Sequence, residues 1–252
     1  MFKYLYSSKF FKKLFYRLGY QEIVLDGITR ENFFDLYFSL KRPFVVQIGT
    51  NDGKTYDPLY NYISKYQLSG LMVEPQAEAF EKLKNNYKDN PNLKFANVAL
   101  REKDGAALFY RIKPNLVLEG KEYKASSGSS FYKDQILVNV KNRLPPVRYD
   151  ILHRISNDPN DYIEEISVKV RTLSSLFREY GIEKIDFLLT DCQGYDYAIL
   201  KQLDFKRFAP DIINFEHSLL TFEELLQSHA LLKNERYQYF IHEGDTCAYK
   251  IS

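Results

Sequence analysis

Cysteine is scarce in this chain and tryptophan is absent: its 252 residues include two cysteines, Cys192 and Cys247. Because the two are neither paired nor spaced like metal ligands, we expect no disulfide framework and a reducing compartment. No apolar run is long enough to cross a bilayer. The first 18 residues interleave lysine and arginine with aromatic residues, unlike the uninterrupted apolar stretch of a secretion signal. Together these absences predict a cytoplasmic protein.

An excess of charge of either sign is also missing. The chain carries 35 lysine and arginine residues against 33 aspartate and glutamate residues, for a net charge of +2. This balance predicts no nucleic-acid or other polyanionic partner. Residues 1–18 are the local exception, because their charges are all positive and their apolar residues recur at helical spacing. They predict an amphipathic helix that packs on the main domain or, as an alternative, makes weak contact with an anionic membrane surface.

What the chain does contain is an alternation of short apolar strands and amphipathic helices from Pro43 onward. The predicted strands cover 44–48, 71–74, 93–100, 107–112, 166–170, 185–189 and 212–215, and a closing antiparallel hairpin pairs 237–241 with 247–251. The predicted helices cover 29–40 (N-cap Thr29), 57–70 (N-cap Asp57), 77–87, 172–180, 195–203 and 222–232. Repeated β-α units predict an α/β fold, with a Rossmann-like, doubly wound, mostly parallel sheet of seven strands.

The pattern divides the chain into an N-terminal helical extension, 1–42, and a Rossmann-like domain, 43–252. Within that domain, residues 113–165 are an irregular insertion with a serine-rich run, 126–130, which we expect to form a lid or an acceptor site. In an open parallel sheet, ligands bind beyond the carboxyl ends of the strands, where the strand order reverses. The strand ends are therefore where we expect the chemistry.

Two neighbouring strand ends predict a nucleoside site. The first strand leads into segment 47–53, in which Gly49 and Gly53 permit a sharp turn close to a ligand. The glycine spacing is not that of a pyrophosphate-binding loop, and an ordinary tight turn is the alternative. Glu74, followed by Pro75, ends the second strand and can accept hydrogen bonds from ribose hydroxyls. Together the two strand ends indicate an adenosine-containing ligand, a class that also includes NAD.

Three further strand ends carry candidate residues. Asn97 and Val98 lie near the end of the third strand, where a polar group could meet the edge of adenine and an apolar wall could pack on its face. Asp191 ends an apolar strand and should lie at the cleft. Glu216 and His217 end the next strand and place a carboxylate beside an imidazole. For His217, a surface or capping histidine is the alternative interpretation.

Several ordered segments resemble the FkbM-type methyltransferase family: FVVQIGTNDGKTYDPLY, LMVEPQAEAFEKLKNNY, NVAL, KIDFLLTDCQGYDYAIL, PDIINFEHSLL and the closing residues 245–249. The resemblance covers residues 43–249 outside the insertion. It implies a Rossmann-like methyltransferase fold and transfer of a methyl group from S-adenosyl-L-methionine, typically to a hydroxyl oxygen.

The resemblance also implies which residues hold the cofactor. The glycine turn would hold its methionine part, the end of the second strand its ribose, the end of the third its adenine, and the strand ending at Asp191 would face the methyl-transfer centre. The cofactor-binding residues would therefore be Gln47, Gly49, Asn51, Asp52, Gly53, Glu74, Pro75, Asn97, Val98 and Asp191.

Two positions depart from the family's pattern. Gln47 stands where this fold often has an acidic residue, so it supplies no charge for the cofactor's ammonium group. Gln193 stands where the family commonly has glutamate, and a loss of that acid would impair or alter an activity that used it as a base or metal ligand. A catalytically inactive nucleoside-binding module is therefore the main alternative function. An NAD-dependent oxidoreductase is disfavoured because the pyrophosphate-binding spacing is missing.

The expected chemistry is an in-line displacement, in which a hydroxyl oxygen of a sugar, glycolipid or other small-molecule acceptor attacks the methyl group. A base near that oxygen assists the loss of its proton. Asp191 and His217 are the candidate bases, with Glu216 orienting or assisting. Asp191 and Glu216 could instead share a divalent cation, but we favour catalysis without a metal.

Overall fold

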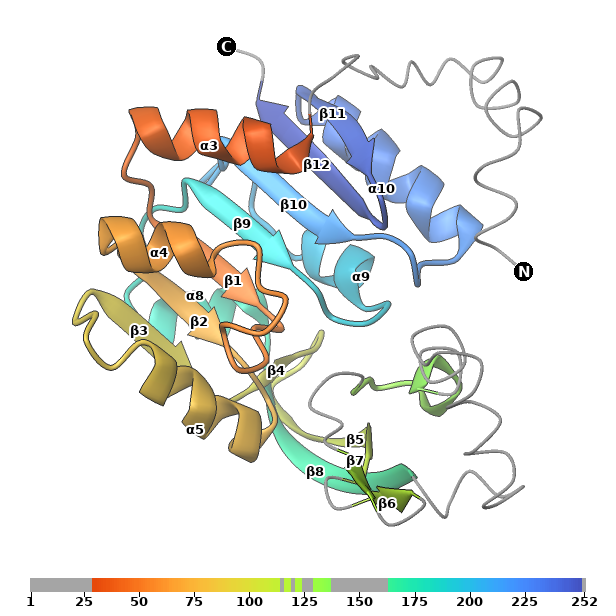
Figure 1. Ribbon diagram of the computed structural model, residues 1–252. Coiled ribbons are helices and arrows are strands. Elements are labelled where there is room, and N and C mark those ends of the chain that lie inside the picture. Colours follow the sequence, from red (N-terminus) through yellow and green to blue (C-terminus); the bar gives the residue numbers. More distant parts are fainter. Residues whose placement is uncertain (1–28, 114–115, 119–120, 124–128, 137–162, 251–252) are drawn as a thin grey trace.

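The computed structural model describes residues 29–113, 116–118, 121–123, 129–136 and 163–250 (Figure 1). A seven-stranded sheet lies at the centre, with the strand order β11-β12-β10-β9-β1-β2-β3. These strands are β1 (Val45–Ile48), β2 (Gly70–Val73), β3 (Leu93–Ala96), β9 (Phe187–Thr190), β10 (Ile212–Glu216), β11 (Tyr237–His242) and β12 (Asp245–Lys250). β3, β2, β1, β9 and β10 run parallel, whereas β12 is antiparallel to both of its neighbours. The predicted doubly wound, mostly parallel sheet and its closing hairpin are confirmed.

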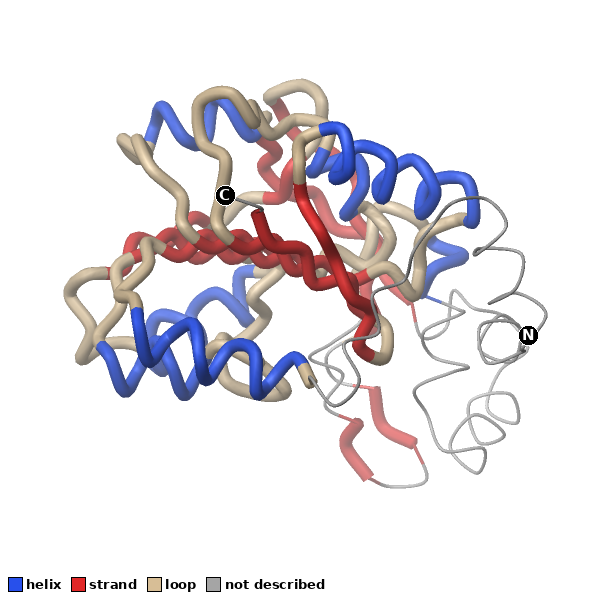
Figure 2. Tube along the Cα trace, turned by 90° about the horizontal axis from the view of Figure 1, so that it is seen from above, coloured by secondary structure: helices blue, strands red, loops and turns tan. Residues whose placement is uncertain are grey.

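Helices cover both faces of this sheet, as Figure 2 shows. One face packs against α3 (Arg30–Leu40), α4 (Tyr60–Tyr66) and α5 (Ala77–Asn86) through a core that includes Phe34, Ile63 and Leu83. The other face packs against α8 (Leu173–Glu179), α9 (Asp196–Leu200) and α10 (Phe222–Asn234). All four residues of β1, β2 and β9 are buried, as expected for parallel strands with helices on both sides.

Local sequence signals set most helix starts. Thr29, Thr172 and Thr221 are N-caps whose side chains accept hydrogen bonds from backbone amides of the first turn, and Thr221 forms a capping box with Glu224. The prediction that a helix begins at Asp57 was wrong: α4 begins at Tyr60. The carboxylate of Asp57 accepts from the amide of Leu59 at 2.7 Å and so closes a turn ahead of the helix.

The helix α3 belongs to the packed core. The rings of Phe34 and Phe38 lie 5.0 Å and 5.4 Å from the ring of Phe187 on β9, at centroid distances typical of favourable aromatic pairs. Residues 30–40 therefore bury a surface of the central sheet. The separate N-terminal extension over 1–42 stays a prediction, and the basic helix expected over 1–18 lies outside the described residues.

A smaller sheet, ordered β4-β8-β5, adjoins the central one. It contains β4 (Ala99–Leu100), β5 (Gly105–Ile112) and β8 (Ile163–Arg171), and a separate hairpin pairs β6 (Leu116–Leu118) with β7 (Lys121–Tyr123). The prediction of one strand over 93–100 was therefore wrong. The chain leaves the central sheet at Asn97, whose side chain donates to the carbonyls of Glu74 at 2.8 Å and Pro75 at 3.1 Å. Within the described ranges, none of the helices has the length and apolar character needed to span a bilayer.

Candidate active site

The site is built at β1, where the strand order reverses. β1 lies between β2 and β9, so the loops that follow these three strands meet at one edge of the sheet (Figure 1). The amide of Gly49 donates to the carbonyl of Val73 at 2.9 Å, and the amide of Asp191 donates to the carbonyl of Ile48 at 3.0 Å. Continued backbone pairing thus brings the turn after β1 between the two neighbouring strand ends.

Gly49 is required by contact with the loop after β9. Its φ is +81°, and a Cβ there would lie 2.1 Å from the carbonyl oxygen of Asp191. Gly53 has a φ of +68°, and a Cβ there would lie 2.4 Å from the side chain of Leu83 on α5. Both glycines therefore have packing reasons that hold without any ligand. They also fix the path of the turn that the sequence assigned to a cofactor.

Glu74 joins the end of β2 to that turn. Its carboxylate accepts from the backbone amides of Asn51 at 2.8 Å and Gln76 at 2.9 Å, and the residue is 3% exposed. Burial raises the pKa of Glu74 to about 7, and the hydrogen bonds from Gln76 and Asn51 oppose this rise. The expected proximity of Glu74 to the glycine turn is confirmed by this contact, while its role toward ribose stays a prediction.

Two other polar residues of the turn, Asp52 and Asn51, differ in whether the protein satisfies their hydrogen-bond acceptors. Asp52 accepts from the amides of Lys54 and Thr55 at 2.9 Å and 2.7 Å, so its carboxylate stabilises the turn itself. Burial alone would raise the pKa of Asp52, but hydrogen bonds from Thr55 and Lys54 hold it below its usual value. The Oδ1 atom of Asn51 is buried and has no hydrogen-bond partner among the described residues. Asn51 thus keeps one acceptor that the fold does not satisfy.

Gln47 reaches an acid that sequence reasoning assigned to a helix cap. Its Nε2 atom donates to the carboxylate of Asp57 at 3.0 Å, whereas its Oε1 atom is buried and has no partner in the described part of the chain. Burial raises the pKa of Asp57 to about 6, against the hydrogen bonds from Leu59 and Gln47. An acidic group therefore lies beside Gln47 although position 47 itself is neutral. The sequence predicted Asp57 only as a helix N-cap, and no sequence signal linked this acid to the site.

The residues assigned to adenine lie at the end of β3. Asn97 is exposed and ties the loop after β3 to the backbone of Glu74 and Pro75, whereas Val98 is buried in the core. The structure thus brings Asn97, Pro75 and Glu74 together at one edge. Val98 packs in the core on the face of the sheet that α8, α9 and α10 cover.

Asp191 and Glu216 end neighbouring strands and share one partner. The Nε2 atom of Gln193 lies 2.6 Å from the Oδ1 atom of Asp191 and 3.0 Å from the Oε2 atom of Glu216. Asp191 is exposed, whereas Gln193 and Glu216 are buried. Glu216 also accepts from the hydroxyl of Ser218 at 2.9 Å. The structure therefore brings the two predicted carboxylates together through Gln193. In the sequence, this residue stood out only because it differs from the glutamate common in the family.

His217 contacts a different element. Its Nδ1 atom lies 2.9 Å from the hydroxyl of Thr246 on β12, and the Nε2 atom of His229 on α10 lies 3.1 Å from the same hydroxyl. The ring of His229 stacks on Tyr239 at 4.1 Å. Burial lowers the pKa of His217 to about 4 and that of His229 to about 3. Both imidazoles are therefore neutral near pH 7.

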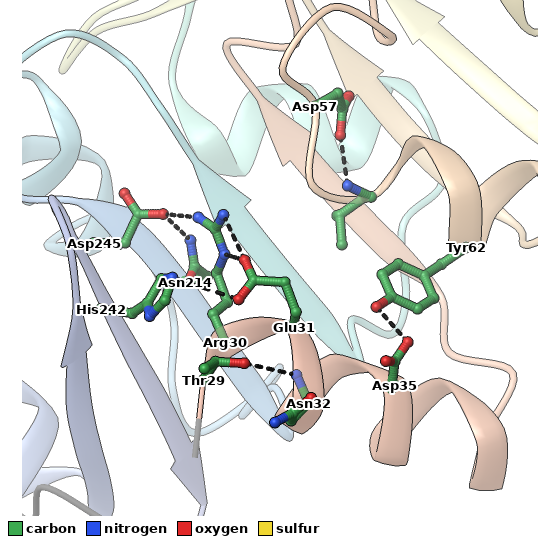
Figure 3. Close-up of polar contacts among 11 residues, drawn as sticks. Thr29, Arg30, Glu31, Asn32, Asp35, Asp57, Tyr62, Asn214, His242 and Asp245 are labelled. Atoms are coloured by element: carbon green, nitrogen blue, oxygen red, sulfur yellow. Dashed lines mark hydrogen bonds and ion pairs between the residues drawn. The ribbon is translucent and has the colours of Figure 1, made fainter. Parts of the chain in front are cut away.

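A charged cluster borders the site where β10 pairs with β12 (Figure 3). Arg30 of α3 forms an ion pair with Asp245, and Asn214 donates to the same carboxylate at 3.2 Å. Asp245 lies opposite Glu216 in the β10–β12 register. Burial raises the pKa of Asp245 above its usual value, and Arg30 opposes this rise. Sequence reasoning missed Arg30, because the pairing joins residues 215 positions apart.

Residues 129–136, here called the clasp, cross the same edge of the sheet. Gln76 donates to the hydroxyl of Ser129 at 3.1 Å, Ser130 donates to the carbonyl of Gln193 at 3.2 Å, and Gln135 donates to the carbonyl of Leu219 at 3.1 Å. The clasp thus contacts the loops after β2, β9 and β10. Of the serine-rich run 126–130 that we expected to form a lid or an acceptor site, residues 126–128 lie outside the described residues, and this role stays a prediction.

Two aromatic residues of the clasp, Phe131 and Tyr132, lie beside Arg101 and Tyr195. The guanidinium carbon of Arg101 lies 4.6 Å from the ring centroid of Phe131 and 5.5 Å from that of Tyr195. Tyr132, which lies 6.3 Å from Tyr195, is 48% exposed. In the parts of the chain that the structure describes, no group of three or more His, Cys, Asp or Glu side chains is arranged to hold a metal ion.

The chain is similar in sequence to a methyltransferase family. A family model described as the methyltransferase FkbM domain matches residues 47–239. The chain is similar to a solved FkbM methyltransferase from Methylobacillus flagellatus, with 14% identity and a TM-score of 0.47 over 82% of this chain and 43% of that one. It thus spans less than half the length of that protein.

A methyltransferase from Geobacter sulfurreducens is similar at 14% identity and a TM-score of 0.42, over 89% of this chain and 80% of that one. A ribosomal protein L11 methylase from Lactobacillus delbrueckii subsp. bulgaricus is similar at 11% identity and a TM-score of 0.37, over 86% and 77% of the two chains. No match was found among curated proteins. The family match extends over most of the chain, and the chain therefore belongs to the FkbM family of S-adenosylmethionine-dependent methyltransferases.

Proposed function

We propose that this protein transfers a methyl group from S-adenosyl-L-methionine to a hydroxyl oxygen of a small-molecule or saccharide acceptor. The observation that carries the proposal is the hydrogen bond from the amide of Asn51 to the carboxylate of Glu74, which joins the glycine turn to the end of β2. Family membership supports the cofactor, whereas the hydroxyl acceptor is our inference from the side chains at the carboxyl ends of the central strands.

The residues present fit this cofactor. The buried Oδ1 atom of Asn51 lacks a partner among the described residues, so a donor on a ligand would satisfy it. Glu74 would accept from the ribose hydroxyls, since each carboxylate oxygen has a second lone pair beyond its backbone hydrogen bond. Asn97 and Pro75 would border adenine. When bound, S-adenosyl-L-methionine supplies a methyl group that its positive sulfur makes susceptible to displacement.

Asp191 is the residue that we assign to the acceptor. It is exposed at the end of β9, and its backbone carbonyl packs against Gly49 of the turn proposed to hold the cofactor. There the carboxylate can take the proton of an attacking hydroxyl and hold its oxygen in line. His217 is less suited to this role, because its ring is 5% exposed and its pKa of about 4 makes it a weak base.

The clasp and its aromatic neighbours are the proposed acceptor side. Tyr132 and Arg101 lie beside Tyr195, which follows Asp191 by four residues in the chain, and we assign them to the acceptor side. The exposed ring of Tyr132, with a polar group nearby, suits a ring that carries hydroxyls. We propose no nucleic-acid partner, because the chain's charges are nearly balanced. A cytoplasmic location and weak membrane contact through residues 1–18 are further proposals.

Two measurements test the function. Calorimetry with S-adenosylhomocysteine and with NAD should show binding of the first alone, and binding of NAD would favour an oxidoreductase. A screen of hydroxylated acceptors with an isotopically labelled methyl donor should then give a labelled product in the wild type and none in Asp191→Ala. Cofactor binding without transfer to any acceptor would favour the inactive nucleoside-binding module.

A further inference from the structure

One amide group spans the side chains that end two neighbouring parallel strands. Gln193 places its Nε2 atom within hydrogen-bonding distance of both Asp191 and Glu216, at 2.6 Å and 3.0 Å. Ionised carboxylates can only accept hydrogen bonds, so the NH₂ group of the amide must face them. Its two N–H groups suffice to give one to each carboxylate.

The backbone at Gln193 is held in the conformation that this requires. Gln193 has a φ of +53°, in the left-handed region that residues other than glycine rarely adopt. Ser130 of the clasp donates to its carbonyl at 3.2 Å. Gly194 follows with a φ of +92°, and a Cβ there would lie 3.0 Å from the Nε2 atom of Gln135. The clasp therefore supports the turn from which Gln193 reaches the two carboxylates.

The nature of the bridging group matters for the chemistry. Two carboxylates that approach each other usually share a proton, a cation or a hydrogen-bond donor, because their charges repel. An amide is neutral and does not titrate, so it holds both carboxylates without adding charge. A glutamate at position 193 would instead add a third carboxylate, which is the oxygen-rich ligand set that divalent cations prefer.

We propose that Gln193 is a positioning residue that couples Asp191 to Glu216, and that its amide fills the place between them that a divalent cation would otherwise take. The positioning of Asp191 for methyl transfer rests on the proposed function. The exclusion of a cation does not, because it follows from the contacts of Gln193 alone. Two experiments therefore address the two parts separately.

The first experiment titrates the wild type, Gln193→Glu and the double variant Gln193→Glu/Asp191→Asn with Mn²⁺ and follows binding by calorimetry. Gln193→Glu should bind Mn²⁺ at least about tenfold more tightly than the wild type, because three carboxylates then face one point. The double variant should return to the affinity of the wild type. Wild-type binding as tight as that of Gln193→Glu, or a folded Gln193→Glu without gain in affinity, overturns the cation part.

The second experiment uses Gln193→Met, which keeps the side-chain length but removes both donors. Its kcat should fall about tenfold while KM for S-adenosylmethionine changes less than about twofold, since the interaction lost is one to the base rather than to the cofactor. Loss of the hydrogen bonds to a carboxylate raises its pKa, so the acid limb of the kcat profile should move to higher pH. An unchanged profile with unchanged kcat overturns the positioning role.

The control for both experiments is Gln227→Met, which removes a glutamine that donates to the carboxylate of Glu223 at 3.0 Å on the exposed face of α10. It should change neither the pH profile nor Mn²⁺ affinity. Circular dichroism of every variant establishes that it is folded. If the wild type transfers no methyl group to any acceptor, the proposed function fails, and the Mn²⁺ titration still decides whether Gln193 keeps a cation out.

Discussion

The backbone amide of Asn51 donates to the carboxylate of Glu74 at 2.8 Å, across a sequence separation of 23 residues. The contact depends on the parallel pairing of β1 with β2, which sets Ile48 beside Val73. It makes the geometry of the glycine turn depend on the charge state and length of one buried side chain. A substitution at Glu74 should therefore change the affinity for the cofactor more than it changes other properties of the protein.

Glu74→Gln should weaken the binding of S-adenosylmethionine about tenfold or more, because a hydrogen bond to a charged acceptor contributes about 1.5–3 kcal/mol. The amides of Asn51 and Gln76 donate to different oxygens of Glu74, and glutamine replaces one of these oxygens with an NH₂ group that cannot accept, so the turn loses one of its contacts. Calorimetry measures the affinity. The matched control is Glu81→Gln on the exposed side of α5, which should bind as the wild type does. Equal affinities for the two variants would refute the ribose role.

Cofactor affinity should also depend on pH through Glu74. Burial raises the pKa of this carboxyl to about 7, so below that pH it is mostly protonated and can no longer accept with both oxygens at full strength. We expect the affinity of the wild type to rise between about pH 5.5 and pH 8 and then to level off. In Glu74→Gln the affinity should be nearly flat over this range. A flat wild-type profile would contradict the assignment.

Gly49→Ala should destabilise the fold by more than about 2 kcal/mol, because the new Cβ meets a backbone carbonyl and the φ of +81° is strained for alanine. Gly181→Ala is the control, since its φ of +60° is also positive but nothing lies within 4 Å of its Cβ position. That variant should lose about 1 kcal/mol from strain alone. Chemical denaturation measures both, and equal losses would show that the close approach of the β9 loop contributes nothing.

The buried histidines should make stability fall in mild acid. The pKa of His229 is lowered by burial to about 3, so the unfolded chain binds a proton near pH 6.5 that the folded chain does not. The stability that this neutral imidazole contributes is present above about pH 6.5 and is lost as the pH falls toward 3. His229→Gln should therefore lose less stability between pH 7.5 and pH 5 than the wild type does.

Comparing the variant with the wild type separates the contribution of His229 to the pH dependence of stability from that of the buried acids. The raised pKa values of these acids change stability in the opposite direction over the same pH range. Burial raises the pKa of Asp196 to about 7, so its contribution makes stability fall as the pH rises from about 4 to 7. Gln227→Met, on the exposed face of α10, removes no titratable group, so it is the control and should keep the wild-type slope. An unchanged slope in His229→Gln would show that its burial is not the cause.

Gln135→Ala should loosen the clasp. The substitution removes the hydrogen bond to the carbonyl of Leu219 and leaves that segment held through Ser129 and Ser130. If the clasp covers the bound cofactor, dissociation of S-adenosylhomocysteine in stopped flow should become about three- to tenfold faster. Asp134→Ala, next to it but exposed, should leave the rate unchanged. Equal dissociation rates in the two variants would show that the clasp does not control release of the cofactor product.

The elements that local sequence patterns encode could be predicted well. The N-cap at Thr29, the apolar strands and the hairpin across Glu243 and Gly244 each depend on residues close together in the chain. The break after β3 could not be predicted, because Asn97 leaves the strand to satisfy carbonyls that belong to another loop. Likewise, no local pattern shows that Asp57 turns toward Gln47.

The sequence predicted at which strand ends the candidate site residues lie, but not which residues they contact. The sequence located Asp191, Glu216 and His217 at strand ends, but side-chain contacts depend on neighbours from distant elements. The Nδ1 atom of His217 contacts Thr246 on β12, whereas Asp191 contacts Gln193. The only local signal there was Gly194, whose positive φ suits glycine, whereas the positive φ of Gln193 could not be predicted from its residue type. Its two carboxylate partners required the fold.

The position of β12 has a consequence for how the protein is made. This strand comes after β11 in the chain yet lies between β10 and β11, so until residues 245–250 have left the ribosome β10 is paired on one side only, with β9, and β11 lacks its neighbour in the sheet. Thr246, to which His217 and His229 both bind, arrives with it. A nascent chain that stalls at His242 would present unpaired edges of β10 and β11 to chaperones, and its site would be unfinished.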